Sequence, residues 1–326
     1  MTVLVTGGAG YIGSHMVYGL ADRGERVVVL DDLSTGNRSL ISHAATLIEG
    51  DVGDEALLHR IIRENAVDAV VHFAGSIVVP ESVAAPLRYY ANNTVKTRTL
   101  IEACVEEGVS NFIFSSTATV FSVNAKQPLS EEELKEPISP YARSKLMTEW
   151  MLEDTARAFT FFRPMVLRYF NVAGADPKGR TGQSTPQATH LIKVAAQVAL
   201  GRRSRLELFG TDYPTPDGTC IRDYIHIADL VSAHLLVLDA LRGGAPSTSY
   251  NVGYGRGLSV REVIKGMEEV IGRELPVVET LRRAGDPPVL VSNPAKLKSA
   301  LGWRPQHEDL HEIIRSAYDW ERRFNS

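Results

Sequence analysis

Short and almost uninterrupted apolar runs alternate with longer helical patterns along the first half of the chain. The runs occupy residues 3–5, 27–30, 69–73 and 111–114. Strands as uniformly apolar as these fit a parallel sheet that is buried on both faces. Helical patterns fill the intervals, at residues 12–23, 54–64 and 86–107. Because parallel strands need crossover connections, this alternation predicts an α/β fold with a doubly wound parallel sheet.

The amino-acid composition of the chain changes after Asn171. Residues 174–186 are rich in glycine, proline and polar side chains, so a second region begins near residue 172. A helical pattern at 227–241 and a late strand at 249–252 are expected to return to the first sheet. With 326 residues, the chain is long enough for two domains of roughly 150 residues. We predict a first domain at 1–171 with returning segments at about 222–253, and a smaller C-terminal α/β domain at 172–221 and 254–326.

Composition excludes several classes of function. Lys and Arg total 35 and Asp and Glu total 39, so the basic excess typical of nucleic-acid binding is missing. No apolar run approaches the roughly 18 residues of a membrane span, and the first strand leaves no room for a signal peptide. Cys104 and Cys220 alone make neither a disulfide framework nor a Cys-rich zinc site, and no other metal motif occurs. We expect a cytoplasmic protein without a metal, a nucleic-acid partner or a membrane partner.

Three glycines stand between the first predicted strand and the first helix. Gly7 permits a tight turn, Gly10 lets the backbone approach a pyrophosphate, and Gly13 allows close packing of helix on strand. Asp31 ends the next strand, 18 residues (31 − 13) beyond Gly13. A carboxylate there accepts hydrogen bonds from the adenosine ribose and repels a 2′-phosphate. The spacing therefore predicts a Rossmann-like site for NAD rather than NADP.

Tyr141 and Lys145 lie four residues apart on a helix predicted to begin at Ser139–Pro140, so they share a face. A phenol has a pKa near 10, and a nearby ammonium together with a bound, positively charged nicotinamide favours the phenolate. Thr117 ends the preceding strand, where its hydroxyl can contact the same substrate oxygen. The three residues predict hydride chemistry at an alcohol carbon, with Tyr141 taking the hydroxyl proton.

The longer motifs of the chain resemble those of the UDP-glucose 4-epimerase family, within the extended short-chain dehydrogenases/reductases. They are the glycines at 7–13, the Tyr141/Lys145 pair, Arg-Tyr-Phe-Asn-Val-Ala-Gly at 168–174, Asp-Gly-Thr-Cys-Ile-Arg-Asp-Tyr-Ile-His at 217–226, and Leu-Gly-Trp at 301–303. The resemblance spans essentially the whole chain. The motifs at 168–174 and 217–226 are much more specific than the glycines.

The resemblance implies NAD in the first domain and a UDP-sugar in the second. Besides Gly7, Gly10, Gly13 and Asp31, it places at the NAD site Tyr11, Ile12, Asp51, Val52, Phe73, Ala74, Gly75, Asn92, Tyr141, Lys145 and Phe170, with Asp51 near the adenine and Lys145 also on the nicotinamide ribose. It places at the UDP-sugar Thr117, Asn171, His190, Leu191, Phe209, Arg222, Arg283 and Asp286. It also implies a homodimer paired through the helices before Gly108 and after Ser139, for which Leu146, Trp150 and Met151 offer apolar contacts.

The implied reaction is the interconversion of UDP-glucose and UDP-galactose, an isomerisation in carbohydrate metabolism. Hydride passes to tightly held NAD, the resulting 4-keto sugar rotates, and hydride returns to the opposite face, so NAD is regenerated. The same reaction serves galactose catabolism and the supply of UDP-galactose for polysaccharides. Leu290 stands where the family controls the room for a 2-acetamido group, which leaves UDP-N-acetylhexosamines as alternative substrates.

The residues argue against two other functions. A 4,6-dehydratase needs an acid and a base directly after Thr117, where Ala118 and Thr119 stand instead. A non-catalytic sensor of NAD or sugar nucleotides would not need the hydroxyl, phenol and lysine that the chain retains. The chain also departs from common family members at Ile77, where many carry a lysine near the cofactor phosphates, and at Phe121–Ser122, which replace a Tyr-Gly pair.

Overall fold

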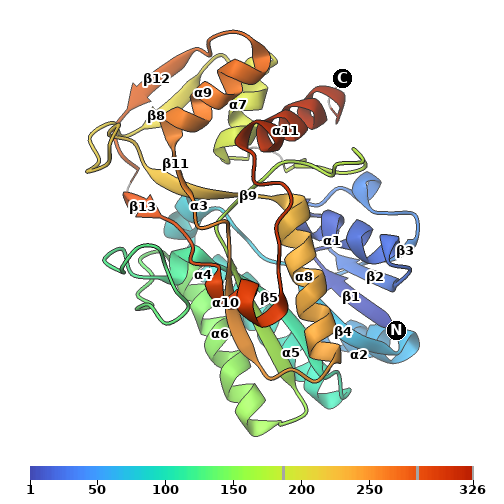
Figure 1. Ribbon diagram of the computed structural model, residues 1–326. Coiled ribbons are helices and arrows are strands. Elements are labelled where there is room, and N and C mark those ends of the chain that lie inside the picture. The colour runs from blue at the N-terminus through green and yellow to red at the C-terminus, as the bar shows by residue number, and fades with distance from the viewer. Residues whose placement is uncertain (186–187, 284–285, 325–326) are drawn as a thin grey trace.

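The computed structural model describes residues 1–185, 188–283 and 286–324 and contains a seven-stranded sheet with helices on both faces (Figure 1). The strand order is β10-β6-β5-β4-β1-β2-β3, and every pair is parallel. The strands are β1 (Thr2–Thr6), β2 (Arg26–Asp31), β3 (Ala45–Glu49), β4 (Val67–His72), β5 (Asn111–Thr117), β6 (Arg163–Tyr169) and β10 (Thr248–Val252). The predicted doubly wound α/β fold is confirmed. β3 was missed because it is a half-exposed edge strand without an apolar run.

Each face of the sheet has its own apolar core. On one face pack α1 (Tyr11–Asp22) and α8 (Ile227–Arg242), with Met16, Leu20 and Leu238 fully buried. On the other face lie α2 (Glu55–Asn65), α5 (Lys96–Glu106) and α6 (Pro140–Ala158). Both returning elements are present as expected, since α8 covers the sheet and β10 extends it beside β6.

The helix expected at 86–107 is interrupted. It consists of α4 (Pro86–Tyr90), a π turn at Ala91–Val95 and α5, and it follows the short α3 (Val79–Ala84). The π turn places Asn93 in the interior, where its side-chain oxygen accepts a hydrogen bond of 2.8 Å from the Ser76 amide. Its amide nitrogen donates to the Ser76 carbonyl and to Ser144 Oγ, both at 3.0 Å. Single π turns often mark functional positions, and this one joins the loop after β4 to α6.

The region after Asn171 contains two small sheets covered by helices. β9 (Ile221–His226) pairs with β7 (Asn171–Ala173), β11 (Gly257–Ser259) and β13 (Val289–Leu290), while β8 (Leu206–Phe209) pairs with β12 (Val277–Thr280). The helices are α7 (Leu191–Ala199), α9 (Val260–Ile271) and α11 (Leu310–Phe324). α10 (Ala295–Leu301), predicted in the second domain, packs instead against α8 and β10, where Leu297 joins the core of the central sheet. In the first region, 3₁₀ turns lie at Arg38–Leu40 and Ala118–Val120. α7, α9 and α11 enclose one apolar core.

One strand departs from the predicted domain division. β9 was assigned to the segment returning to the first sheet, yet it pairs only with strands of the second domain. The return begins one element later, at α8, because β9 runs parallel to β7 and β13 and thereby continues the short sheet that follows Asn171.

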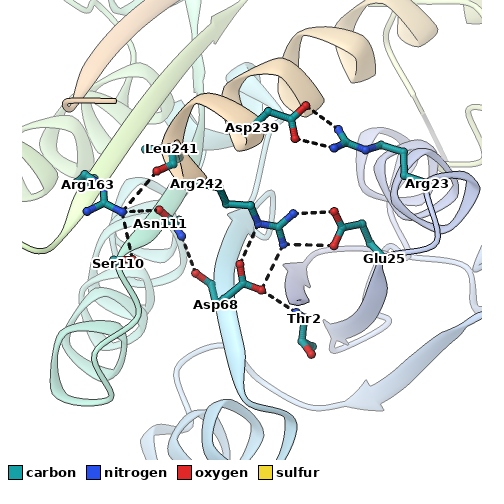
Figure 2. A network of polar contacts seen from close by, with 10 residues as sticks. All are labelled: Thr2, Arg23, Glu25, Asp68, Ser110, Asn111, Arg163, Asp239, Leu241 and Arg242. Carbon is teal, nitrogen blue, oxygen red and sulfur yellow. Dashed lines mark hydrogen bonds and ion pairs between the residues drawn. The ribbon is translucent and has the colours of Figure 1, made fainter. Parts of the chain in front are cut away.

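An ion network ties the helices to the amino-terminal ends of the central strands (Figure 2). Arg242, the last residue of α8, binds Glu25 at 2.6 Å and Asp68 at 2.9 Å. Asp68 also accepts a hydrogen bond of 2.6 Å from the amide of Thr2, at the start of β1. The network therefore anchors the amino-terminal ends of the strands. Asp31 and Thr117 stand at the opposite, carboxyl-terminal ends.

Candidate active site

The first turn of α1 is an open anion site. Its N-cap residue, Gly10, makes no side-chain capping bond, and the turn holds no acidic residue. Gly7 has a φ of +69°, and a Cβ there would lie 2.6 Å from the Ala74 amide nitrogen. A Cβ on Gly13 would lie 2.1 Å from the Gly7 carbonyl oxygen. Free N–H groups at a helix start, with no side chain in front of them, fit a pyrophosphate.

Asp31 stands beside this loop at the end of β2. One carboxylate oxygen accepts the Ala9 amide at 2.9 Å and the other accepts the Leu33 amide at 2.9 Å. Burial raises the pKa of this carboxyl, and the two amide hydrogen bonds oppose the rise. The carboxylate is therefore held in a fixed orientation at the carboxyl edge of the sheet, where a ribose would lie.

The residues predicted around the rest of the cofactor lie on the neighbouring loops. Asp51 accepts hydrogen bonds from Lys96 at 2.5 Å and from the Gly53 amide at 2.7 Å, and despite partial burial these hold its pKa below the ordinary value. Lys96 was not predicted as a site residue from the sequence, because a lysine at the start of a helix is usually exposed to solvent. Asn92 donates to Ser76 Oγ at 2.9 Å, in the loop after β4.

The three predicted catalytic residues meet at the ends of α6 and β5. Tyr141 lies near Thr117, which lowers the pKa of the phenol. Lys145 donates to the Ser115 carbonyl at 2.9 Å, and its ammonium lies 4.9 Å from the centroid of the Phe114 ring. α6 starts at Pro140 with Ser139 capping the Ala142 amide, as expected, and this start aims both side chains at β5. The trio lies together on one face of the helix.

Burial governs the acid–base properties of the trio. It lowers the pKa of Lys145 to about 8 and raises the pKa of Tyr141 to about 12, although Thr117 lowers the latter. Lys145 was expected to lower the phenol pKa, but in the chain by itself burial raises that pKa and the opposing effect comes from Thr117. Desolvation penalises any charged form, so a further positive charge is needed to stabilise the phenolate.

Two histidines that lie near these sites are structural. His72 is buried and bonds to Thr6 at 2.6 Å and to Thr97 at 2.8 Å, and burial lowers its pKa to about 3. His226 caps the Ala228 amide at the start of α8. Both are therefore packed, hydrogen-bonded histidines.

Three of the predicted substrate residues line one cleft between the domains. Asn171, His190 and Leu191 share it with Tyr11 of α1 and with Gln183 and Tyr224, which the sequence analysis did not identify. Gln183 Nε2 lies 3.2 Å from His190 Nδ1. Tyr224 lies inside the motif at 217–226 and pairs in register with Asn171, so its place in the cleft follows from the pairing of β7 with β9.

The other predicted substrate residues gather beside Tyr224. The Arg283 guanidinium lies 4.9 Å from the centroid of the Phe209 ring and binds Asp286 at 2.9 Å. Arg222 is buried and donates to the Ile221 carbonyl at 2.9 Å, and within the described ranges no carboxylate pairs with it. Both arginines act to lower the pKa of Tyr224, which burial nevertheless raises. A buried arginine without a carboxylate partner suits an anionic ligand.

Apolar side chains form a further wall next to Thr117. Leu290 of β13 packs in one buried cluster with Phe121, Phe170 and Leu129. Phe121, a departure from the family pattern, is therefore a core residue here, and its ring lies 5.2 Å from the Arg168 guanidinium. Ile77, the other departure, is about half exposed.

Among the described residues no helix is long and apolar enough to cross a membrane, and no group of three or more potential metal ligands is brought together.

Comparison with known proteins places the chain in a family. Residues 3–253 match the model of the NAD dependent epimerase/dehydratase family. A relative from Azospirillum brasilense named UDP-glucose 4-epimerase is 57% identical over 98% of this chain and 92% of its own length. The chain belongs to the UDP-glucose 4-epimerase family.

Solved structures of this family share the whole fold. The UDP-glucose 4-epimerase from Brucella ovis, in complex with NAD, is 45% identical and superposes with a TM-score of 0.94 over 98% of this chain and 97% of its own. The UDP-Glc/GlcNAc 4-epimerase from Campylobacter jejuni is 47% identical, with a TM-score of 0.86 over 98% of this chain and 99% of its own. Fold and family membership thus agree with the resemblance noted in the sequence.

Proposed function

We propose that this protein is an NAD-dependent UDP-glucose 4-epimerase that interconverts UDP-glucose and UDP-galactose. The observation that carries the proposal is the joining of Thr117, Tyr141 and Lys145 at the carboxyl edge of a sheet whose first helix presents an open anion site. NAD, when bound, accepts the hydride from carbon 4 and returns it. The A. brasilense relative, at 57% identity, supports this reading over a non-catalytic sensor.

Tyr141 is the group that removes and returns the proton of the sugar 4-hydroxyl. Thr117, which lies near the phenol and lowers its pKa, shares that sugar hydroxyl and orients it. Lys145 anchors beside Ser115 and supplies a positive charge near the phenol when it is protonated, which its pKa of about 8 permits at neutral pH. Positioned acid–base groups of this kind contribute about 10²–10⁴-fold to a rate.

The nucleotide part of the substrate is held by the second domain. Arg222 and Arg283 offer fixed guanidinium groups to the diphosphate, with Phe209, Asp286, Asn171, His190 and Leu191 around it. Firm binding of the nucleotide leaves the sugar free to turn, and a turn exposes its other face to the same hydride position. In this division of labour, residues 1–171 hold NAD and the region after Asn171 holds the UDP-sugar.

A second substrate class is favoured by one observation. Leu290 is smaller than an aromatic residue and packs in one cluster with Phe121 and Phe170, so it fills less of that site than an aromatic side chain would. We therefore propose that UDP-N-acetylhexosamines are slower alternative substrates. The similarity to the C. jejuni enzyme, whose name includes GlcNAc, supports this proposal.

We further propose a homodimer in the cytoplasm. Leu87, Val95, Met147 and Trp150 are exposed by 40–80% on α4, the π turn and α6, which pack against one another. Of the contacts suggested from the sequence, Trp150 alone is exposed, since Leu146 is buried and Met151 packs against the core. Exposed apolar patches of this kind mark interfaces.

The cytoplasmic location is argued from the cysteines. Two buried free cysteines, Cys104 and Cys220, suit a reducing compartment.

Proton NMR of the purified protein with UDP-galactose, without added cofactor, tests the main proposal. Formation of UDP-glucose is expected and would demonstrate both the reaction and retained NAD. A second sample with UDP-N-acetylgalactosamine measures the alternative activity. If UDP-galactose stays unchanged even after NAD is supplied, the proposed function is wrong.

A further inference from the structure

Three successive turns of α6 face three consecutive residues of β5. Tyr141 lies near Thr117, which lowers its pKa, and Lys145 donates to the carbonyl of Ser115 at 2.9 Å. Glu149, one turn further along, accepts a hydrogen bond of 2.5 Å from Ser116 Oγ. The first two contacts belong to the catalytic trio, and the third has no part in the proposed chemistry.

Glu149 is a buried carboxylate held by two adjacent strands. Its second partner, Arg168 of β6, stands directly opposite Ser116 in the register of the sheet. Arg168 Nη2 binds Glu149 Oε2 at 2.7 Å and Nε binds Oε1 at 3.0 Å. Both side chains are nearly inaccessible, at 4% and 7% of their free exposure. Arg168 also donates to the Glu131 carbonyl at 3.2 Å, which fixes the loop that precedes α6 against β6.

A buried ion pair is a poor source of stability, because the cost of desolvating the charges cancels much of their attraction. Its best-attested use is to fix register, since any displacement leaves a charge unpaired. Here a shift of α6 along β5 would break the bonds of Glu149 with Ser116 and Arg168. The same shift would carry Tyr141 away from Thr117. Misplacement of a catalytic group by about 1 Å can cost about 10²-fold in rate.

We propose that Glu149, through Ser116 and Arg168, is a positioning residue that sets the alignment of Tyr141 and Lys145 against Thr117. The proposal rests on the proposed function for its kinetic consequence. Its structural consequence, a change in the Tyr141–Thr117 contact, can be measured without turnover. Sequence reading missed Glu149 because a glutamate on a helix is normally a solvated residue.

Ser116→Ala is the sharpest test, because it removes the bond to β5 and leaves the Glu149–Arg168 pair in place. We expect kcat for UDP-galactose to fall about tenfold with KM changed by less than about twofold, as displacement of an aligned group predicts. The acid limb of the kcat–pH profile is expected to move to higher pH, since a weaker interaction with Thr117 disfavours the phenolate. Ser116→Thr keeps the hydroxyl and is expected to restore both values.

Other titratable groups remain in place in these variants. Tyr141 raises the pKa of Tyr169 on β6, Lys145 lowers the pKa of His72 on β4, and Lys135 lies near Glu149 and Arg168. The matched control is Glu25→Gln, which weakens the ion network with Arg242 at the opposite edge of the sheet (Figure 2). It is expected to lower the free energy of unfolding and to leave kcat and its pH profile unchanged.

The readout independent of turnover is the ¹³Cζ resonance of Tyr141, assigned by its loss in Tyr141→Phe. This resonance is expected to shift in Ser116→Ala and in Glu149→Gln, and to stay in place in Glu25→Gln. If it stays in place in all three variants and the pH profiles superimpose, the positioning role is wrong and the pair is only structural. An inactive wild-type protein whose Tyr141 resonance still shifts in Ser116→Ala would overturn the proposed function and leave the positioning role supported.

Discussion

The hydroxyl of Tyr11 donates a hydrogen bond of 2.6 Å to the carbonyl of Gly174. Tyr11 opens α1 beside the glycine loop, and Gly174 follows β7 in the second domain. Gly174 has a φ of +89°, and a Cβ there would lie 2.6 Å from the His226 ring, so its carbonyl is presented by a rigid turn. Ser14 adds a parallel bond of 2.8 Å to Thr181. The start of the cofactor helix is thus joined directly to the segment that leads to the substrate cleft.

Tyr11→Phe is expected to weaken UDP binding without releasing NAD. Loss of one hydrogen bond costs about 1 kcal/mol, or roughly fivefold in Kd. Calorimetric titration with UDP measures the change, and the absorbance of released cofactor measures retention. Tyr18→Phe, on the same helix, is the control because it keeps the ring that lies 4.5 Å from the Arg180 guanidinium. An unchanged Kd for UDP would show that the bond does not shape the cleft.

Tyr141→Phe is expected to lower turnover by about 10²-fold or more, as for other losses of an acid–base group. Binding of NAD and of UDP should persist, because the ring and Lys145 remain. The rate of UDP-galactose conversion and the bound-cofactor content measure the two effects. Wild-type turnover in this variant would remove Tyr141 from the mechanism.

Asp31→Ala is expected to reduce the preference for NAD over NADP. The carboxylate accepts two backbone amides beside the glycine loop and repels a 2′-phosphate. Binding of the two cofactors to stripped protein gives the ratio of their affinities. Asp32→Ala is the neighbouring control, since that carboxylate bonds only to Ser34 among the described residues. An identical ratio in wild type and Asp31→Ala would refute the ribose assignment.

Lys145→Met is expected to change how stability depends on pH. Burial lowers the pKa of Lys145 to about 8, from 10.5 for the free group. Between these values the unfolded chain binds more protons than the folded one, so this group makes the folded state more stable as pH rises. The free energy of unfolding of cofactor-free wild type, relative to the variant, should rise by up to about 3 kcal/mol from pH 8 to 10.5. Urea unfolding of both proteins at the two pH values measures this difference, and parallel stability curves would contradict it.

Trp150→Glu is expected to dissociate the proposed dimer. The indole is about half exposed on α6, so a carboxylate is tolerated in the monomer but is costly in an apolar interface. Sedimentation velocity measures the oligomeric state. The control is Phe161→Glu, an exposed residue after the end of α6 and away from α4. A monomeric wild type, or a dimer that survives the substitution, would place the interface elsewhere or remove it.

Local patterns in the sequence determined much of this protein. Buried parallel strands are apolar along their whole length, so β1, β2, β4 and β5 were recognisable without their partners. The spacing of Gly7, Gly10, Gly13 and Asp31 predicted the anion site, because a turn and one crossover helix fix those positions. Tyr141 and Lys145 were paired by the period of a single helix. The motif at 217–226 identified Arg222 as a residue of the UDP-sugar site, although its strand was assigned to the returning segment.

Only the tertiary structure decided which charges are buried. Glu149, Ser116 and Arg168 are 33 and 19 residues apart along the chain, and each is ordinary in its own segment. Their contact depends on the register of β5 against β6 and on the position of α6 across both strands. The place of β9 in the second sheet and the π turn around Asn93 likewise follow from long-range pairing. Local sequence sets the conformation of a segment, whereas the desolvation of a charge depends on segments that meet only in the folded chain.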